Sequence, residues 1–218
     1  MMKNYRTILF DLDGTITDSS ASILNCIRYA LDKMNWEIPD DTVLKKFLGP
    51  PLDYSYAEYC GMNAEQVRET VDIHRERYKK YCVTENSLYD GVYGVLERLY
   101  GEGLRLGTAT SKPEKFSVPI LEGFGIKKFF TAVCCAPANG ADVGKASIIK
   151  NALAACGEED LSRAVMVGDR FYDIEGAKAA GIASIYALYG YGSRSEAERY
   201  EADFIVESPE EIVKIILK

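Results

Sequence analysis

Residues Tyr5–Phe10 read YRTILF, a short apolar run with β-branched residues, and DLDGT follows at once as residues 11–15. A run of this length, bounded by an Asp-Leu-Asp-Gly turn, is typical of a buried strand. An isolated Asp-Gly is also a common turn signal that needs no function. The stretch therefore predicts a strand that ends in two carboxylates, Asp11 and Asp13.

The residues after this strand form a long block of helical patterns. Ser19–Trp36 places apolar side chains at helical spacing after the possible cap residues Asp18 and Ser19. Three further helices are predicted at Asp40–Leu48, Leu52–Cys60 and Asn63–Cys82. We expect His74, in the strongly charged last helix, to lie at the surface or at a cap. Because no strand pattern occurs between Thr17 and about Tyr89, residues 17–89 are expected to be an all-helical insertion.

From Asp90 onwards, strand and helix patterns alternate. Strands are predicted at Leu104–Ala109, Thr131–Cys135, Ala164–Val167, Ala183–Tyr186 and Phe204–Val206. Helices are predicted at Gly91–Tyr100, Pro113–Phe124, Lys145–Cys156, Tyr172–Ala180 and Glu210–Leu217. Such alternation indicates an α/β fold, a doubly wound parallel sheet with helices on both faces. Residues 1–16 and 90–218 are then expected to form this core, with residues 17–89 as an inserted all-helical domain.

The composition excludes several classes of protein and narrows the chemistry. The chain has 218 residues and a net charge of −7, which argues against nucleic acid polymers and anionic membranes as partners. It has neither an apolar run near the roughly 20 residues needed to span a bilayer nor a secretory signal pattern, so a cytoplasmic location is expected. The six cysteines form no C-x-x-C pair and His74 is the only histidine, which leaves little for a zinc site. Acid–base work therefore falls to carboxylates.

Polar residues follow four of the predicted strands, and ligands of doubly wound sheets bind at the carboxyl ends of strands. These residues are Asp11 and Asp13, Thr110 and Ser111, Lys145, and Asp169 with Asp173. Each has an ordinary alternative interpretation as a turn, a helix cap or a solvated lysine. Their order and their convergence at one edge of the sheet favour a shared site.

Three carboxylates at one sheet edge repel one another unless a cation lies among them. Oxygen ligands without histidine or cysteine favour Mg²⁺, which keeps several waters and leaves a place for a phosphate oxygen. Together with a lysine and a hydroxyl, this set of groups suits phosphoryl transfer.

Asp11-Leu12-Asp13-Gly14-Thr15, followed in order by Thr110, Lys145 and Gly168-Asp169-(x)₃-Asp173, resembles the haloacid dehalogenase superfamily. The helical block resembles the helical cap of its phosphoglycolate phosphatase-like and 5′-nucleotidase-like members. The segment Leu188–Ser193 is also similar to that branch. The resemblance covers essentially the whole chain.

The resemblance implies a two-step mechanism. Asp11 attacks phosphorus and forms an aspartyl-phosphate. Asp13 protonates the leaving alcohol and then removes a proton from the attacking water. Thr110, with the backbone N–H of Ser111, binds phosphoryl oxygens, and Lys145 offsets the negative charge.

The resemblance also implies Mg²⁺ held by Asp11, the backbone carbonyl of Asp13, and Asp169. Asp173 is expected to orient Lys145 or a water at the metal. One departure concerns the lysine, because relatives commonly have Pro-x-Pro just after it, whereas Ala146-Ser147-Ile148 follows Lys145. Lys150 is the alternative lysine.

A mobile cap fits this chemistry, since the site must exclude bulk water during transfer and admit water afterwards. The expected hinges are Ile16–Ser19 and Ser87–Gly91. Gly49-Pro50-Pro51-Leu52 is a candidate substrate contact, with an ordinary helix-breaking turn as the alternative. The tyrosines Tyr54, Tyr56 and Tyr59 are interpreted as helix-packing residues, with stacking on a base or sugar as the alternative.

The sequence thus favours a magnesium-dependent phosphatase for a small phosphorylated metabolite, acting as a monomer or weak homodimer. Phosphoglycolate is the first expectation for the substrate. A nucleoside 5′-monophosphate is the second, because the aromatic cap and the missing Pro-x-Pro keep the nucleotidase-like branch open. A phosphosugar mutase resembling β-phosphoglucomutase is a further alternative. A haloacid dehalogenase is disfavoured, because cleavage of a carbon–halogen bond needs neither Asp13 nor the acids of the metal site. A receiver-type phosphorylated switch is also disfavoured, because its first motif has adjacent acids and no helical cap interrupts its core.

Overall fold

The computed structural model describes residues 4–137 and 144–218. Part of the loop expected before Lys145 therefore lies outside the described residues. The backbone divides into two compact units, one made of Met1–Asp18 and Leu88–Lys218 and the other of Ser19–Ser87. We call them the core unit and the helical unit, and each is described by itself.

The core unit is built on a six-stranded sheet in the order β5-β4-β1-β6-β7-β8. Its strands are β1 (Thr7–Phe10), β4 (Arg105–Pro113), β5 (Phe130–Ala136), β6 (Ala164–Gly168), β7 (Ala183–Ala187) and β8 (Phe204–Val206). All neighbouring strands run parallel. All four residues of β1 are buried, as expected for an inner strand covered on both faces. The predicted α/β fold is confirmed.

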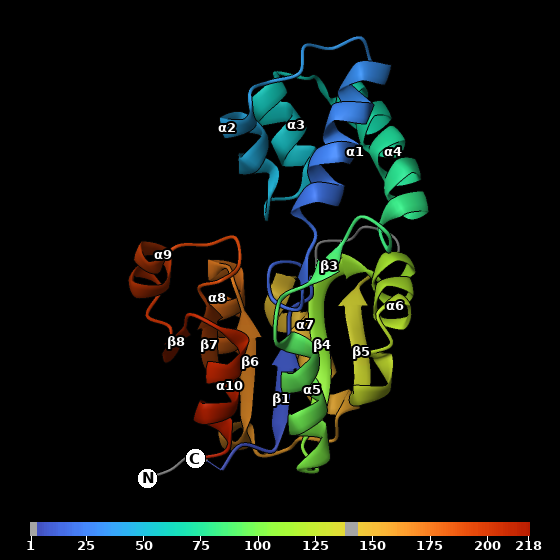
Figure 1. Ribbon diagram of the computed structural model, residues 1–218. Coiled ribbons are helices and arrows are strands. Elements are labelled where there is room, and N and C mark those ends of the chain that lie inside the picture. The colour runs from blue at the N-terminus through green and yellow to red at the C-terminus, as the bar shows by residue number, and fades with distance from the viewer. Residues whose placement is uncertain (1–3, 138–143) are drawn as a thin grey trace. The chain divides into compact units, whose positions relative to one another are not determined.

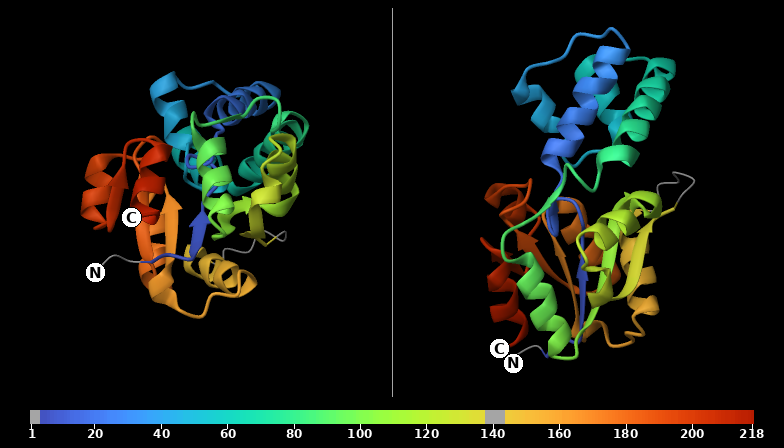
Figure 2. Two further views of the ribbon diagram at one scale, coloured as in Figure 1. Left: turned by 60° about the horizontal axis from the view of Figure 1, so that its bottom comes forward. Right: turned by 45° about the vertical axis from the view of Figure 1, so that its right-hand side comes forward.

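Helices cover both faces of this sheet, as Figures 1 and 2 show. One face carries α5 (Val92–Gly101), α6 (Glu114–Gly123) and α10 (Pro209–Ile216), and the other carries α7 (Gly144–Ala155) and α8 (Phe171–Ala180). Ile149 and Leu153 of α7 are buried in one cluster with Leu9 and Met166 of the strands. Each such side chain stabilises the fold by about 1.5–3 kcal/mol. A short helix, α9 (Arg194–Arg199), was not predicted.

Two short strands join the units. They are β2 (Thr17–Asp18) and β3 (Ser87–Leu88), and they pair with each other. The Tyr89 N–H donates to the Ile16 carbonyl at 3.2 Å, next to this pair. These strands were not predicted from the sequence, because two residues are too few to show an alternation of apolar and polar side chains.

The helical unit contains α1 (Ser20–Lys33), α2 (Asp41–Leu44), α3 (Leu52–Cys60) and α4 (Ala64–Tyr81). The single helix predicted at Asp40–Leu48 is a short α-helix continued by a 3₁₀ turn at Lys45–Phe47. The unit has its own core, in which Ile27, Leu31 and Phe47 are buried. Within the described residues, no helix is both long and apolar enough to cross a bilayer.

The expected surface position of His74 is wrong. Its side chain is 3% exposed, and Nδ1 lies 3.0 Å from the hydroxyl of Tyr56, which is itself fully buried. His74 shares the buried face of α4 with Val67, Val71 and Tyr78, while most of the charged residues of that helix are exposed. Tyr56 is therefore a packing residue.

Candidate active site

Lys145 lies between two carboxylates at the carboxyl edge of the sheet. Its Nζ is 2.9 Å from Asp11 Oδ2 and 2.7 Å from Asp173 Oδ1. Asp11 directly follows β1, and its N–H donates to Val167 of the neighbouring strand β6. Burial opposes the charged form of Lys145, but Asp11 and Asp173 outweigh it and raise the pKa of the lysine. The ammonium is thus held charged against the predicted nucleophile.

Asp169 follows β6 and is completely buried. Thr15 Oγ1 donates to its Oδ1 at 3.2 Å, and the Tyr191 N–H donates to its Oδ2 at 2.9 Å. Burial, together with the nearby charges of Asp173 and Asp11, raises the pKa of Asp169 well above its ordinary value.

Asp173 lies in the first turn of α8, where its Oδ2 accepts the Arg170 N–H at 3.1 Å. Burial raises the pKa of Asp173 to about 6, with Lys145 opposing this shift and Asp11 adding to it. The surroundings of Asp169 and Asp173 therefore favour the protonated, neutral form of both carboxyl groups.

A bound divalent cation would stabilise the charged form of these carboxylates. Asp11, Asp169 and Asp173 each offer one carboxylate oxygen, and these oxygens lie within 4.8 Å of one another. The donors are all hard oxygens, the set that Mg²⁺ prefers. The residues present therefore fit the metal that the sequence analysis expected. The same cluster includes Asp173, which that analysis placed outside the ligand set.

Glycines let the backbone approach these carboxylates. A side-chain methyl on Gly14, which has φ +80°, would overlap the Asp169 carboxylate. A methyl on Gly168 would overlap the Asp173 side chain. The Gly in Asp-Leu-Asp-Gly and the Gly in Gly-Asp are thus required by close approach at the site.

Asp13 forms an ion pair with Lys112, a contact that the sequence analysis did not predict. The Lys112 side chain is 8% exposed and that of Asp13 is 26% exposed. Lys112 lies in an irregular stretch of β4, where the register with β5 shifts between Thr110 and Pro113. Such bulges re-aim side chains next to sites. In the sequence, the signal that could have pointed to Lys112 was its position two residues after Thr110.

The remaining predicted residues are placed as follows. Phe10 of β1 is opposite Thr108 of β4, so Thr110 lies at the same edge of the sheet as Asp11. Thr110 is buried, and its Oγ1 accepts the Lys112 N–H at 3.1 Å. The Ser111 residue is exposed.

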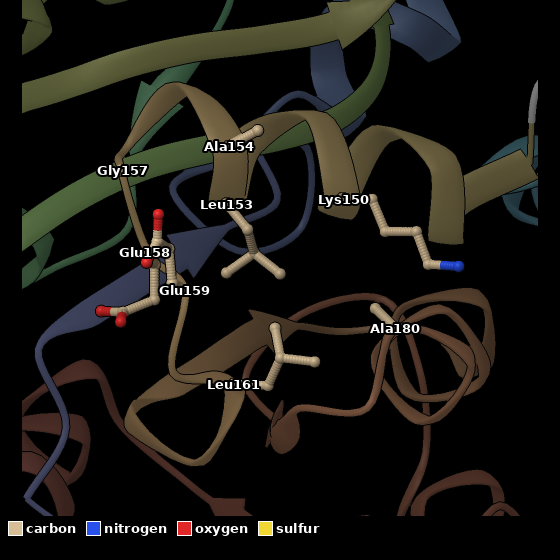
Figure 3. Close-up of a pocket in the computed structure, with 8 residues that line it drawn as sticks. All are labelled: Lys150, Leu153, Ala154, Gly157, Glu158, Glu159, Leu161 and Ala180. Atoms are coloured by element: carbon tan, nitrogen blue, oxygen red, sulfur yellow. The ribbon is translucent and has the colours of Figure 1, made fainter.

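Lys150, the alternative lysine, does not reach the carboxylates. It is exposed and lines a shallow hollow with Leu153, Ala154, Leu161 and Ala180 (Figure 3). Lys145 is therefore the lysine that the structure brings to the site, despite the missing Pro-x-Pro.

This arrangement can support attack on phosphorus by a carboxylate. Asp11 is exposed enough to meet a ligand, with its side chain 15% accessible, and a buried ammonium lies beside it. A second carboxylate, Asp13, follows two residues later and is available for acid–base catalysis at a leaving group.

Comparison with known proteins agrees with this chemistry. The profile described as "haloacid dehalogenase-like hydrolase" matches residues 8–187. A 5′-nucleotidase of Pseudomonas aeruginosa is 34% identical over 197 residues, which cover 90% of this chain and 89% of that protein. A tyrosine-protein kinase PtkA of Mycobacterium tuberculosis is 35% identical, covering 91% of this chain and 64% of the relative. A phosphoglycolate phosphatase of Salmonella typhi is 29% identical, covering 95% and 90% of the two chains.

Solved structures show the same similarity. A putative phosphatase from Clostridium difficile superimposes with a TM-score of 0.91 at 39% identity, covering 98% of this chain and 99% of the other. The family profile, the relatives and this structure agree over nearly the full length. The chain therefore belongs to the haloacid dehalogenase-like hydrolases and is a phosphatase of that type.

Proposed function

We propose that the protein is a magnesium-dependent phosphatase that hydrolyses small phosphomonoesters through an aspartyl-phosphate on Asp11. The observation that carries this proposal is the position of Lys145, whose ammonium lies within 3 Å of both Asp11 and Asp173 while Asp169 completes an oxygen cluster. In the transition state of phosphoryl transfer, negative charge is spread over the equatorial oxygens of the phosphoryl group. Cations close to the nucleophile stabilise this charge and so lower the barrier.

In the first step, an Asp11 oxygen bonds to phosphorus and the phosphorus–oxygen bond to the leaving group breaks. Asp13 gives its proton to the leaving oxygen. In the second step, water attacks phosphorus and gives a proton to Asp13, while the bond between phosphorus and the Asp11 oxygen breaks. Inorganic phosphate leaves and the Asp11 carboxylate is restored. Lys112 is proposed to hold the Asp13 carboxyl in position between these steps.

Thr110 and the Ser111 N–H are proposed to bind the phosphoryl oxygens, and Lys145 to offset their charge. Asp11 and Asp169, with the Asp13 carbonyl, would hold Mg²⁺, and Asp173 would orient Lys145 or a water at the metal. When bound, the cation supplies charge neutralisation at the phosphoryl group.

We also propose that the helical unit is the cap of this family and that the β2–β3 pair marks its hinges. Gly49-Pro50-Pro51-Leu52 remains the proposed substrate contact of that unit. A cytoplasmic location and a monomeric or weakly dimeric state are further proposals.

For the substrate, phosphoglycolate is proposed first. The similarity to a 5′-nucleotidase, at 34% identity, supports a nucleoside 5′-monophosphate as the second candidate. A panel containing phosphoglycolate, nucleoside monophosphates, pyrophosphate and hexose phosphates separates these candidates. Isomerisation of a hexose phosphate without phosphate release would instead indicate a mutase, and ATP-dependent tyrosine labelling would indicate a kinase.

The central test is phosphate release from p-nitrophenyl phosphate with Mg²⁺ or with EDTA. Asp11→Asn is expected to abolish turnover, whereas Asp72→Asn, at an exposed position in α4, serves as the matched control. Turnover retained in Asp11→Asn would refute the proposed nucleophile. Turnover unaffected by EDTA would refute the metal requirement.

A further inference from the structure

The loop Leu188–Ser193, between β7 and α9, lies directly against the candidate cation site. A methyl on Gly190 would overlap both the Gly14 carbonyl and the Asp169 side chain. A methyl on Gly192 would overlap the Tyr186 hydroxyl and the Asp169 carbonyl. The loop can take this position only because both residues lack a side chain.

Hydrogen bonds connect this loop to Asp169 and to the Asp11–Thr15 turn. The Tyr191 N–H donates to Asp169 Oδ2 at 2.9 Å. The Tyr189 hydroxyl donates to the Thr15 carbonyl at 3.0 Å. Thr15 in turn donates from Oγ1 to Asp169 Oδ1 at 3.2 Å. One oxygen of Asp169 thus accepts a hydrogen bond from the loop itself, and the other accepts one from Thr15, which the loop also contacts.

The same two tyrosines reach both segments that join the core unit to the helical unit, residues 16–19 and 87–91, which we call the outgoing and the returning linker. The Tyr191 hydroxyl donates to Asp18 Oδ1 of β2 at 3.5 Å and also hydrogen-bonds the Tyr89 side chain. The Tyr89 ring meets the Tyr189 ring edge-on, with centroids 5.1 Å apart. Tyr89 directly follows β3, so the outgoing and the returning linkers are both attached to one loop.

These contacts give Asp169 two functions that are linked. A cation bound by Asp169 would hold its carboxylate in one orientation, the one in which Oδ2 accepts the hydrogen bond from the Tyr191 N–H. A ligand that binds only one arrangement stabilises every contact of that arrangement, and the coupling is reciprocal. Ordering of Asp169 therefore favours the loop position in which Tyr189 and Tyr191 hold the linkers.

We propose that Tyr191 is a positioning residue that couples cation binding at Asp169 to ordering of the two linkers, with Tyr189 as its partner. This inference rests on the proposed function to the extent that Asp169 holds the cation. It adds a role for Leu188–Ser193, a segment to which the proposed chemistry assigns none.

The test is hydrogen exchange measured by mass spectrometry on the full chain, with MgCl₂ or with EDTA, over peptides covering residues 14–19 and 86–92. Thermal unfolding over a Mg²⁺ titration is measured in parallel and reports cation binding without catalysis. Tyr191→Phe removes the hydroxyl and leaves the N–H to Asp169 intact. Tyr189→Phe is the second variant, and Tyr100→Phe, at a 53% exposed position on α5, is the control.

In the wild type and in Tyr100→Phe, Mg²⁺ is expected to raise the unfolding temperature and to slow exchange in both peptides. In Tyr191→Phe Mg²⁺ still raises the unfolding temperature, while the slowing decreases by about two- to tenfold, as loss of one hydrogen bond predicts. A merely structural role would speed exchange equally with and without Mg²⁺. Tyr189→Phe is expected to behave like Tyr191→Phe, with a loss confined to the 14–19 peptide.

Full Mg²⁺-dependent slowing in Tyr191→Phe would overturn the proposal. So would a wild type whose unfolding temperature rises with Mg²⁺ while exchange in the linkers does not change. A wild type that responds to Mg²⁺ in neither measurement would refute the metal site of the proposed function as well. The two failures are therefore distinguishable.

Discussion

Replacing Asp169 with asparagine should make the metal-free protein more stable while removing its response to Mg²⁺. The Asp169 carboxylate is fully buried, and Asp11 and Asp173 lie within 4.8 Å of it. Asparagine keeps the volume and offers an oxygen to the Tyr191 N–H. Its amide turns toward Thr15 Oγ1, which is able to accept as well as to donate.

The magnitude follows from the charges. At an effective dielectric constant of about 20, two unit charges 4.8 Å apart repel by about 3.5 kcal/mol. Lys145 offsets part of this repulsion through its ion pairs with Asp11 and Asp173. The cost of an ionised Asp169 at pH 7 is limited to about 4 kcal/mol, because beyond that protonation is the cheaper state. We therefore expect Asp169→Asn to gain about 1–4 kcal/mol of unfolding free energy without metal.

The pH dependence has a definite sign. The pKa of Asp169 is raised in the folded protein, so the stability that this group contributes is fully present below the pKa of the unfolded chain, about 3.9. That stability is lost as the pH rises through the raised pKa. The advantage of Asp169→Asn should thus be absent near pH 4 and grow towards neutral pH.

Urea unfolding in EDTA and in MgCl₂ measures both effects. A cation at a hundred times its dissociation constant stabilises the wild type by about 2.7 kcal/mol, and the variant should lack this gain. Glu175→Gln, an exposed carboxylate change on α8, is the control and should respond like the wild type. An Asp169→Asn protein with a full Mg²⁺ response, or one that is less stable than the wild type in EDTA, would refute the reasoning.

Three further changes test other contacts. Lys145→Met leaves the buried Asp173 and the partly exposed Asp11 without their ammonium and should cost about 3–5 kcal/mol in urea unfolding, whereas the exposed Lys150→Met should cost almost nothing; equal effects would contradict the assignment of the lysine. Lys112→Met keeps the apolar stem but releases Asp13, so kcat for p-nitrophenyl phosphate should fall about tenfold with the fold intact, and an unchanged kcat would exclude a positioning role. The ion pair with Arg77 lowers the pKa of Glu85 below its ordinary value of 4.5. Glu85 therefore stabilises the fold at pH values above 4.5, and this stabilisation is lost as the pH falls through the lowered pKa. Glu85→Gln should therefore unfold at lower urea than the wild type at pH 7, and the two midpoints should converge in acid.

Much of the core could be predicted because its information is local. Apolar runs and helical spacing place the strands, and parallel strands bring their carboxyl ends to one edge. Lys145 and Asp173 thus meet Asp11 although they are far away in sequence.

The contacts that the sequence did not predict depend on pairs with no shared pattern. Lys112 lies 99 positions from Asp13, and the Tyr191 N–H lies 22 positions from the Asp169 carboxylate. His74 shows the opposite failure. The charged residues around it in the sequence suggested an exposed helix, whereas α4 has a buried face that includes His74. Its hydrogen-bond partner Tyr56 belongs to a different helix, α3, so no local pattern pointed to the contact.

The pairing of β2 with β3 has an evolutionary consequence. The chain leaves and re-enters the core unit at two adjacent strands, so the intervening residues form one large loop with its ends side by side. The entropic cost of closing such a loop rises only slowly with its length. Nature, or an engineer making chimeras, is thus free to lengthen, shorten or transplant whatever is spliced there without rebuilding the catalytic scaffold.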